Sequence, residues 1–176
     1  MKKKFLIRAA LSVAAIAALV VFLKTLNWLP SAIEDGYMRS YADVSGLRLK
    51  SGIKDPHVPS YFPEGLRWPP SAILAQRRPY PAIIMEFNGT KRNDVCLEIF
   101  QYARGGRMPA EGRIKFSEIK EKARYALKGR PALLEAGVCG GEPCSRITWD
   151  EGTYRMRAVM KSPPFELIRV AGSMLR

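Results

Sequence analysis

The stretch that decides the fold is Ser145–Arg176, which reads SRITWDEGTYRMRAVMKSPPFELIRVAGSMLR. Two of its segments, Ser145–Asp150 and Thr153–Lys161, flank Glu151-Gly152, a dipeptide typical of a tight turn. In the second segment every other side chain is apolar, which is the period of a strand with one buried face. The sequence therefore predicts an antiparallel hairpin. Its second strand would bury Tyr154, Met156, Ala158 and Met160 and present Arg155 and Arg157 on the opposite face.

An amphipathic helix is expected directly after this hairpin. Ser162 is a suitable N-cap residue, and Pro163 and Pro164 are tolerated in a first helical turn. From Phe165 to Leu175 the apolar residues recur near the 3.6-residue period of a helix. A closing helix after a run of hairpins indicates an α+β fold, in which a curved antiparallel sheet carries the C-terminal helix on one face.

More strands are predicted upstream of this stretch. Ala82–Phe87 and Val95–Tyr102 are apolar runs rich in strand-forming residues. Asn88-Gly89 and a polar loop separate them, so the two runs predict a second hairpin. Ala72–Gln76 is expected to form a short strand, whereas the pattern of Ile114–Ile119 is ambiguous.

The N-terminus predicts a membrane anchor. After the basic start Lys2–Lys4, the run Phe5–Leu23 is apolar apart from Arg8 and Ser12 and is about long enough to cross a bilayer. Basic residues on the short side of such a helix keep that side in the cytoplasm. We therefore expect an uncleaved, single-pass transmembrane helix (a signal-anchor) within residues 1–26, in the inner (cytoplasmic) membrane, with the C-terminal domain extracytoplasmic. A cleaved signal peptide and a buried soluble helix are the alternatives.

The rest of the chain predicts one periplasmic domain behind a connector. Residues 27–58 are expected to be the connector and to contain a short helix that begins near Ser31. Residues 59–176 are enough for one domain with its own core. The formal net charge is +13. Because the expected compartment argues against nucleic acid as a partner, an anionic membrane surface or an acidic partner fits this charge better. The alternative is that the basic residues are only the solvated faces of strands and loops.

The three cysteines suggest one disulfide. Cys139 and Cys144 enclose Gly-Gly-Glu-Pro, a sequence of strong turn character, so a hairpin there would bring the two sulfur atoms within bridging distance. Cys96 lies in an apolar strand pattern and is expected to be a small buried side chain. A zinc site of these cysteines with His57 is not expected, because the spacing matches no common pattern.

The sequence carries no recognisable catalytic motif, and we expect a protein that is not an enzyme and has no cofactor. His57 is the single histidine, so histidine-based acid–base chemistry would depend on that residue alone. No phosphate-binding glycine loop and no metal-ligand pair is present in the sequence. Glu86 and Glu98 lie on adjacent predicted strands and would be close enough to act as paired carboxylates. The alternative is that both lie on the solvent face of their hairpin.

Four segments resemble a known group of domains. They are Tyr61–Gly65, Gly129–Leu134, Ile147–Tyr154 and Phe165–Met174. Their order is similar to that in the small extracytoplasmic domain of unknown function of membrane-anchored anti-sigma-factor-like proteins, which is related to the MucB/RseB and lipoprotein-carrier group. The resemblance covers about residues 59–175 and implies the curved sheet with its closing helix. Direct sigma-factor binding is not expected, because no zinc-finger-like segment precedes the predicted anchor.

The function expected from these features is that of a membrane-anchored binding or sensor module with an unknown protein, peptide or lipid ligand. Such a domain can hold a partner at an open sheet edge or in a groove between sheet and helix. The candidate binding residues are Trp68, Phe87, Trp149 and Tyr154, with Arg155 and Arg157 for an anionic group. One alternative is an accessory subunit that acts through its anchor helix. Another is a thiol-dependent redox protein that uses Cys139 and Cys144.

Overall fold

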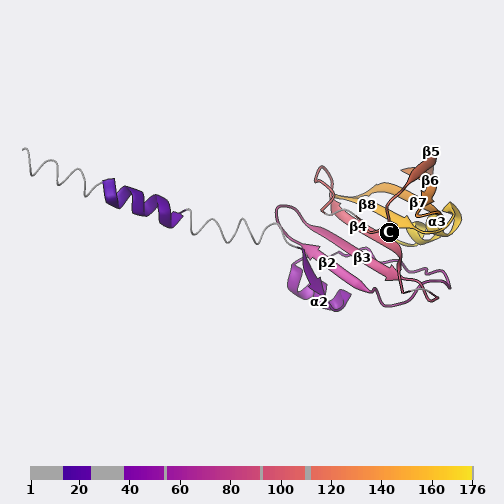
Figure 1. The fold of residues 1–176 in the computed structure, drawn as a ribbon, viewed down its shortest axis with the longest axis horizontal. Coiled ribbons are helices and arrows are strands. Elements are labelled where there is room, and N and C mark those ends of the chain that lie inside the picture. Colours follow the sequence, from indigo (N-terminus) through magenta and orange to yellow (C-terminus); the bar gives the residue numbers. More distant parts are fainter. Residues whose placement is uncertain (1–13, 25–37, 54, 92, 110–111, 176) are drawn as a thin grey trace, which may run out of the picture. The chain divides into compact units, whose positions relative to one another are not determined.

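The computed structural model describes residues 14–24, 38–53, 55–91, 93–109 and 112–175 (Figure 1). The chain divides into two units, Met1–Tyr37 and Met38–Arg176. Within the first unit, residues 14–24 form a helix. The second unit contains the sheet.

The predicted membrane anchor is wrong. Across the described residues, no helix combines the length and the apolar character needed to cross a membrane. Residues 1–13 and 25–26 of the expected span lie outside the described residues, as does the short helix expected near Ser31. The transmembrane helix, the signal-anchor, the integral membrane partner and the inner-membrane location are therefore not supported.

The described residues of the second unit form eight strands and two helices (Figure 1). The strands are β1 (Arg39–Tyr41), β2 (Ala72–Gln76), β3 (Ala82–Asn88), β4 (Val95–Ala103), β5 (Glu118–Leu127), β6 (Arg130–Cys139), β7 (Glu142–Glu151) and β8 (Tyr154–Met160). The helices are α2 (Val44–Ser51) and α3 (Pro164–Ser173).

All strands belong to one antiparallel sheet with the order β1-β2-β3-β4-β8-β7-β6-β5. The sheet consists of two meanders, β1–β4 and β5–β8, joined where β4 pairs with β8. The last strand of the chain is thus central, and β5, which begins the second meander, lies at one edge. The loop from β4 to β5 crosses from the centre of the sheet to this edge.

The predicted α+β class is wrong in the proportion of strand to helix, as well as in its membrane helix. The structure is mostly an eight-stranded antiparallel sheet with small helices. Two regions account for the difference. The expected connector contributes β1 and α2, and α2 is capped by Asp43, whose carboxylate accepts the Gly46 N–H at 2.6 Å. The ambiguous region around Ile119 continues into β5, which is ten residues long.

Individual hairpins follow the sequence pattern closely. β3 pairs with β4, and β7 pairs with β8 around a turn in which Gly152 has φ 58°. Both predicted hairpins are therefore confirmed. The predicted cap of the last helix is wrong, because Pro163 occupies the N-cap position of α3 and makes no side-chain cap hydrogen bond. The backbone carbonyl of Ser162 instead accepts a hydrogen bond from the Ser145 hydroxyl at 2.9 Å.

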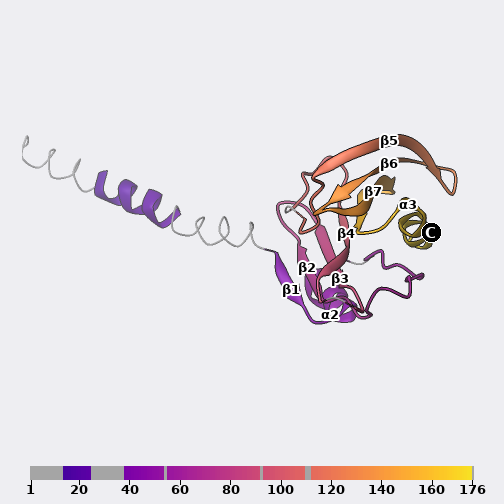
Figure 2. The same ribbon diagram turned by 45° about the vertical axis from the view of Figure 1, so that its right-hand side comes forward.

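The main core lies on one face of the sheet, beneath α3. It includes Phe87, Leu97, Trp149 and Leu167, all almost fully buried. In Figure 2, β5, β6 and β7 arch over α3. A smaller apolar cluster lies on the opposite face, where side chains such as Phe100 pack against the loop between β4 and β5. The two faces therefore differ: one carries a helix, the other a loop and most of the buried charges.

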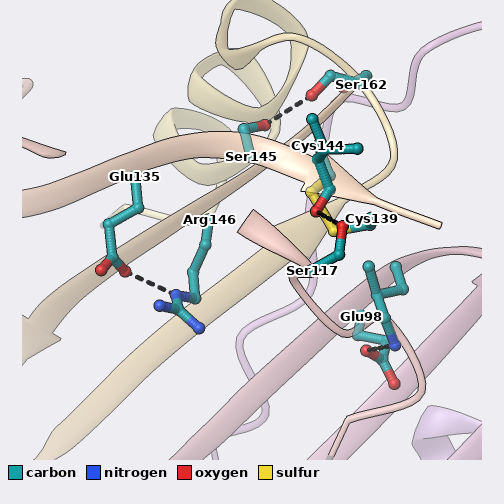
Figure 3. Close-up of a disulfide and its surroundings, with 10 residues drawn as sticks. Glu98, Ser117, Glu135, Cys139, Cys144, Ser145, Arg146 and Ser162 are labelled. Carbon is teal, nitrogen blue, oxygen red and sulfur yellow. Dashed lines mark hydrogen bonds and ion pairs between the residues drawn. A yellow bond between two sulfur atoms is a disulfide. The ribbon is translucent and has the colours of Figure 1, made fainter. Parts of the chain in front are cut away.

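The predicted disulfide is confirmed, since Cys139 and Cys144 are bonded (Figure 3). The turn between β6 and β7 is Gly140-Gly141, whose φ values of 57° and 86° need glycine. Cys139 pairs with Glu142 in the ladder and Cys144 with Gly137, so the two cysteines are diagonal neighbours. Both cysteines are buried, and Cys96 is the free cysteine.

Candidate functional site

The four predicted aromatic site residues do not form one groove. Trp68 is 56% exposed, and its ring lies 6.3 Å from that of Phe87, which is fully buried. Trp149 is 2% exposed, and its indole Nε1 has no hydrogen-bond partner among the described residues. Tyr154 is half-buried and makes an edge contact with His57. These rings are mainly core residues, and Trp68 is the exposed member.

The two predicted arginines lie on the opposite face of the sheet. Arg155 donates two hydrogen bonds to Asp150, at 2.8 and 3.2 Å. Arg157 donates to the Met108 sulfur at 3.0 Å, and its Nε has no partner within the described part of the chain. The hydrogen bonds from Arg155 lower the pKa of Asp150. The six predicted residues therefore do not converge on one ligand.

A more coherent site forms around Glu86 and Glu98. These residues are direct cross-strand partners on β3 and β4. They are 5% and 1% exposed, so the expectation that they lie on a solvent face is wrong. Each carboxylate has a different partner: Glu98 accepts the backbone N–H groups of Arg113 and Ile114 at 2.6 and 2.9 Å. Glu86 pairs with the Arg113 side chain, with Nε 3.1 Å from Oε1.

Glu98 fastens the loop that follows β4 onto the sheet. Its two hydrogen bonds fix the backbone at Arg113 and Ile114, and Ile114 is buried in the smaller core. Gly112 lies tight against this carboxylate, because a Cβ there would be 2.7 Å from Glu98 Oε2 and one of the two would have to shift. The Glu98 carboxylate therefore holds the backbone of the loop, and this places the Arg113 side chain beside the Glu86 carboxylate.

A pocket of about 550 Å³ opens beside Glu86. Asp94 and Lys161 form a second ion pair in its wall, with Lys161 Nζ 2.7 Å from Asp94 Oδ2. The volume is in the range of small-molecule sites, but the lining is mainly polar. The lining residues come from β2, β3, β4 and four loop segments: Ser71, Ala72, Glu86, Asn88, Asn93, Asp94, Val95, Arg113 and Lys161.

The pKa values of the two acids of the pocket, Glu86 and Asp94, are shifted in opposite directions. Burial raises the pKa of Glu86 above its ordinary value, Arg113 partly opposes this, and the neighbouring Glu98 adds to it. The hydrogen bond from Lys161 lowers the pKa of Asp94. Glu86 is thus a carboxylate whose ionised form is incompletely compensated by the protein. No group of three or more potential metal-ligating side chains is present within the described ranges.

Another buried glutamate lies farther along the same sheet face. Glu135 on β6 is 4% exposed and accepts a hydrogen bond from Arg146 Nε at 2.6 Å (Figure 3). Lys122 Nζ lies 3.4 Å from its other oxygen. Burial raises the pKa of Glu135, but the bonds from Arg146 and Lys122 outweigh burial and leave the pKa lowered. This cluster is compensated within the protein.

The edge strand β5 is the longest accessible segment of the sheet. It pairs with β6 on one side and ends the strand order on the other. Nine of its ten residues are exposed. Gly137 allows β6 to pack closely against its start, because a Cβ there would collide with the Glu118 carbonyl oxygen.

His57 and the cysteines have structural partners. The backbone N–H of His57 donates to Gln101 Oε1 at 2.8 Å, and the ring Nδ1 lies 3.3 Å from the Met174 carbonyl oxygen. His57 is 7% exposed, so it joins the start of the domain to α3 and the sheet. Burial raises the pKa of the Cys96 thiol, which disfavours a reactive thiolate.

Comparison with known proteins gives no match: no family model, no curated protein and no solved structure is similar to this chain. The resemblance to the anti-sigma-factor-associated domain therefore stays a prediction.

Sequence reasoning identified Glu86 and Glu98 as a possible pair but missed the basic residues around them. A glutamate inside each apolar run, AIIMEF and VCLEIF, was the available signal. Arg113 lies in a loop and Lys161 follows the last strand, so no local pattern connects either of them to Glu86. Only the pairing of β4 with β3 and β8 brings these residues to one pocket.

Proposed function

We propose that this domain is a non-catalytic binding module that captures an extended acidic segment of a partner protein along β5. The observation that carries the proposal is the exposure of nine consecutive residues of this edge strand, Glu118 to Ala126. An unpaired strand edge offers alternating backbone N–H and C=O groups, which an extended peptide can pair with as an added strand. Ten residues give room for several such hydrogen bonds.

The charge of the edge favours an acidic partner, because β5 carries three basic residues, Lys120, Lys122 and Arg124, against two acids, Glu118 and Glu121. Lys122 and Arg124 pair with residues 135 and 133 of β6, so both lie on the sheet face of Glu135. Lys120 is exposed beside them. The chain as a whole has a formal net charge of +13, which raises the rate of encounter with acidic segments.

The same charge disfavours a second copy of this chain as the occupant. In an antiparallel pair of two β5 strands related by a twofold axis, directly opposed residues lie on the same sheet face. The basic residues of one copy would then approach those of the other, and like charges directly opposite each other destabilise strand pairing. Lysines on an edge also discourage unspecific strand addition. An acidic segment would place opposite charges beside these basic residues, so neither the like-charge repulsion nor the effect of the edge lysines would oppose its pairing.

The experiment uses a labelled decapeptide of alternating glutamate and valine and measures its fluorescence anisotropy with the full chain. We expect binding that weakens with salt. A lysine–valine peptide of the same length should not bind. The acidic peptide N-methylated at alternate residues should bind at least about tenfold more weakly, because it cannot complete the backbone ladder.

Charge reversal at the edge supplies the protein side of the test. Lys120→Glu combined with Arg124→Glu should reduce affinity at least about tenfold. Arg48→Glu combined with Lys50→Glu reverses two exposed charges on α2 and should have a much smaller effect. Equal losses in both double variants would reduce the interaction to general charge attraction. A dimer found by sedimentation that the β5 variant abolishes would replace the acidic partner by a second copy.

The structure gives less support to the thiol alternative. Cys139 and Cys144 are 4% and 1% exposed, and an external thiolate must reach a sulfur atom to exchange with the disulfide. The bond joins two neighbouring strands and is consistent with a structural role. The accessory-subunit alternative depended on the membrane helix and has no support.

A further inference from the structure

We propose that the pocket beside Glu86 is a second binding site, which takes a small ligand that carries a guanidinium or primary ammonium group. It lies in the β2–β3–β4–β8 part of the sheet, and the proposed peptide site is the β5 edge. The two proposals therefore stand on different residues. Each can fail without the other.

Glu86 is the group that would hold the cation. Its side chain is 6% exposed, and within the described chain the Arg113 guanidinium is the only cation at salt-bridge distance. The structure shows no hydrogen bond from another described residue to its carboxylate. A buried carboxylate with a single partner has capacity for a further charge-assisted hydrogen bond. Because Glu86 lines the pocket, a ligand in the pocket can reach it.

Arg113 shows which chemistry the carboxylate accepts. The Arg113 guanidinium reaches Glu86 from a loop and forms an ion pair with it. Because the Arg113 side chain is 68% exposed, water competes for the guanidinium and the ion pair contributes little to stability. The loop does not depend on this side chain for its place, because Glu98 holds the backbone at Arg113 and Ile114. Arg113 can therefore leave Glu86 while the loop stays in position, and it acts as an exchangeable internal ligand.

The opposite wall suits a ligand with a second cation. Asp94 carries a 39% exposed carboxylate that is paired with Lys161, and both residues line the pocket. The acids that line the pocket, Glu86 and Asp94, equal its bases, Arg113 and Lys161, in number, so both carboxylates are present at the site on a chain of net charge +13. The amides of Asn88 and Asn93 supply neutral hydrogen-bonding groups. A short, flexible dication matches this set.

Agmatine, which has a guanidinium at one end and a primary ammonium at the other, is the probe. Isothermal titration calorimetry with the full chain should show saturable binding. Glu86→Gln keeps the shape of the side chain and should weaken binding at least about tenfold. Asp94→Asn should weaken binding about threefold or more, and 4-guanidinobutanoate, which has a carboxylate in place of the ammonium, should bind more weakly than agmatine.

Arg113→Ala provides the most specific outcome. Because it removes the internal competitor for Glu86, it should tighten agmatine binding by about threefold or more. A role for Arg113 in contacting the ligand predicts the opposite sign. Glu135→Gln is the matched control, since it neutralises an equally buried glutamate on the same face and should leave agmatine binding unchanged. Circular dichroism of each variant checks that it is folded.

The proposal is overturned if neither the wild-type chain nor Arg113→Ala binds agmatine at millimolar concentration. It is also overturned if folded Glu86→Gln and Asp94→Asn both bind as well as the wild type. Loss of acidic-peptide binding in the β5 variant with agmatine binding intact would leave this proposal standing alone.

Discussion

Glu86 and Glu135 are the same residue type on the same face of one sheet, and both are at least 95% buried. Their surroundings differ in one respect. Glu135 has Arg146, which is directly opposite in the ladder, and Lys122 on the other side. Glu86 has the Arg113 guanidinium, which reaches it from a loop. The pKa of Glu135 is lowered, whereas burial leaves that of Glu86 raised.

The comparison shows that the partner decides the electrostatic state of a buried acid. Strand pairing places Arg146 directly opposite Glu135, and the Arg146 side chain is 23% exposed. The Arg113 side chain is 68% exposed and competes with water for its contact. One glutamate is therefore structural, and the other is available to a ligand.

Removing Arg146 should have the largest effect. Arg146→Met leaves Glu135 buried with Lys122, and losing one partner of a largely buried pair should lower the free energy of unfolding by about 2 kcal/mol. Arg113→Met should lower it by less than about 0.5 kcal/mol. Urea unfolding followed by circular dichroism measures both. Equal losses would contradict the contrast between strand and loop partners.

Gly112→Ala tests whether the loop is held in place by Glu98. The new Cβ would lie 2.7 Å from Glu98 Oε2, so the loop or the carboxylate must shift. We expect a loss of about 1–2 kcal/mol in the free energy of unfolding and a further rise in the pKa of Glu86 as Arg113 moves away. Carbon-detected NMR titration follows the pKa.

Gly65→Ala is the control for this variant, because a Cβ at Gly65 meets no atom within 4 Å. Its effect should stay within about 0.5 kcal/mol. If Gly112→Ala is as mild as Gly65→Ala, the Glu98 contact does not determine the position of the loop.

The smallest effects come from neutralising the two glutamates, and their signs should be opposite at pH 7. Because the pKa of Glu86 is raised by folding, its ionised form costs stability as pH rises through the folded pKa. Glu86→Gln should therefore raise the free energy of unfolding by up to about 1 kcal/mol. The lowered pKa of Glu135 contributes stability above its unfolded value, which is lost as pH falls through the folded pKa. Glu135→Gln should therefore lower the free energy of unfolding by about 1 kcal/mol.

Unfolding measured from pH 7 down to pH 3 checks these signs. Below the ordinary glutamate value of 4.5, the difference between Glu86→Gln and the wild type should disappear, because Glu86 is then protonated. The difference for Glu135→Gln should also shrink, but at lower pH than for Glu86. If both variants change the free energy of unfolding in the same direction, the two carboxylates are neutralised by their basic partners to a similar extent.

Hairpins were predictable from the sequence because they depend on neighbours in the chain. The alternating pattern before and after Glu151-Gly152 defined β7 and β8, and Gly140-Gly141 placed the disulfide. The edge strand β5 was not predicted, since nine of its residues are exposed and lack the alternation that marks a half-buried strand. Length and apolar content also failed as a guide at the N-terminus, where the described helix does not meet the requirements of a membrane span.

The candidate site was predictable only in part. Glutamates within the apolar runs of β3 and β4 indicated an unusual position, and the hairpin register made them neighbours. The position of Arg113 depends on how the loop after β4 packs, and that of Lys161 on β8 returning to the centre of the sheet. Such contacts between residues distant in the chain have no local sequence pattern.

The disulfide between β6 and β7 has a consequence for strand alignment. A slip of two residues between paired strands keeps every side chain on its face, so the hydrophobic pattern alone does not prevent it. The covalent bond between Cys139 and Cys144 does prevent it in this hairpin. Since β5 pairs with β6, the bond holds in register the strand on which the β5 edge is built. Oxidation of two buried sulfur atoms thereby secures the foundation of the hydrogen-bonding edge that the domain presents to a partner.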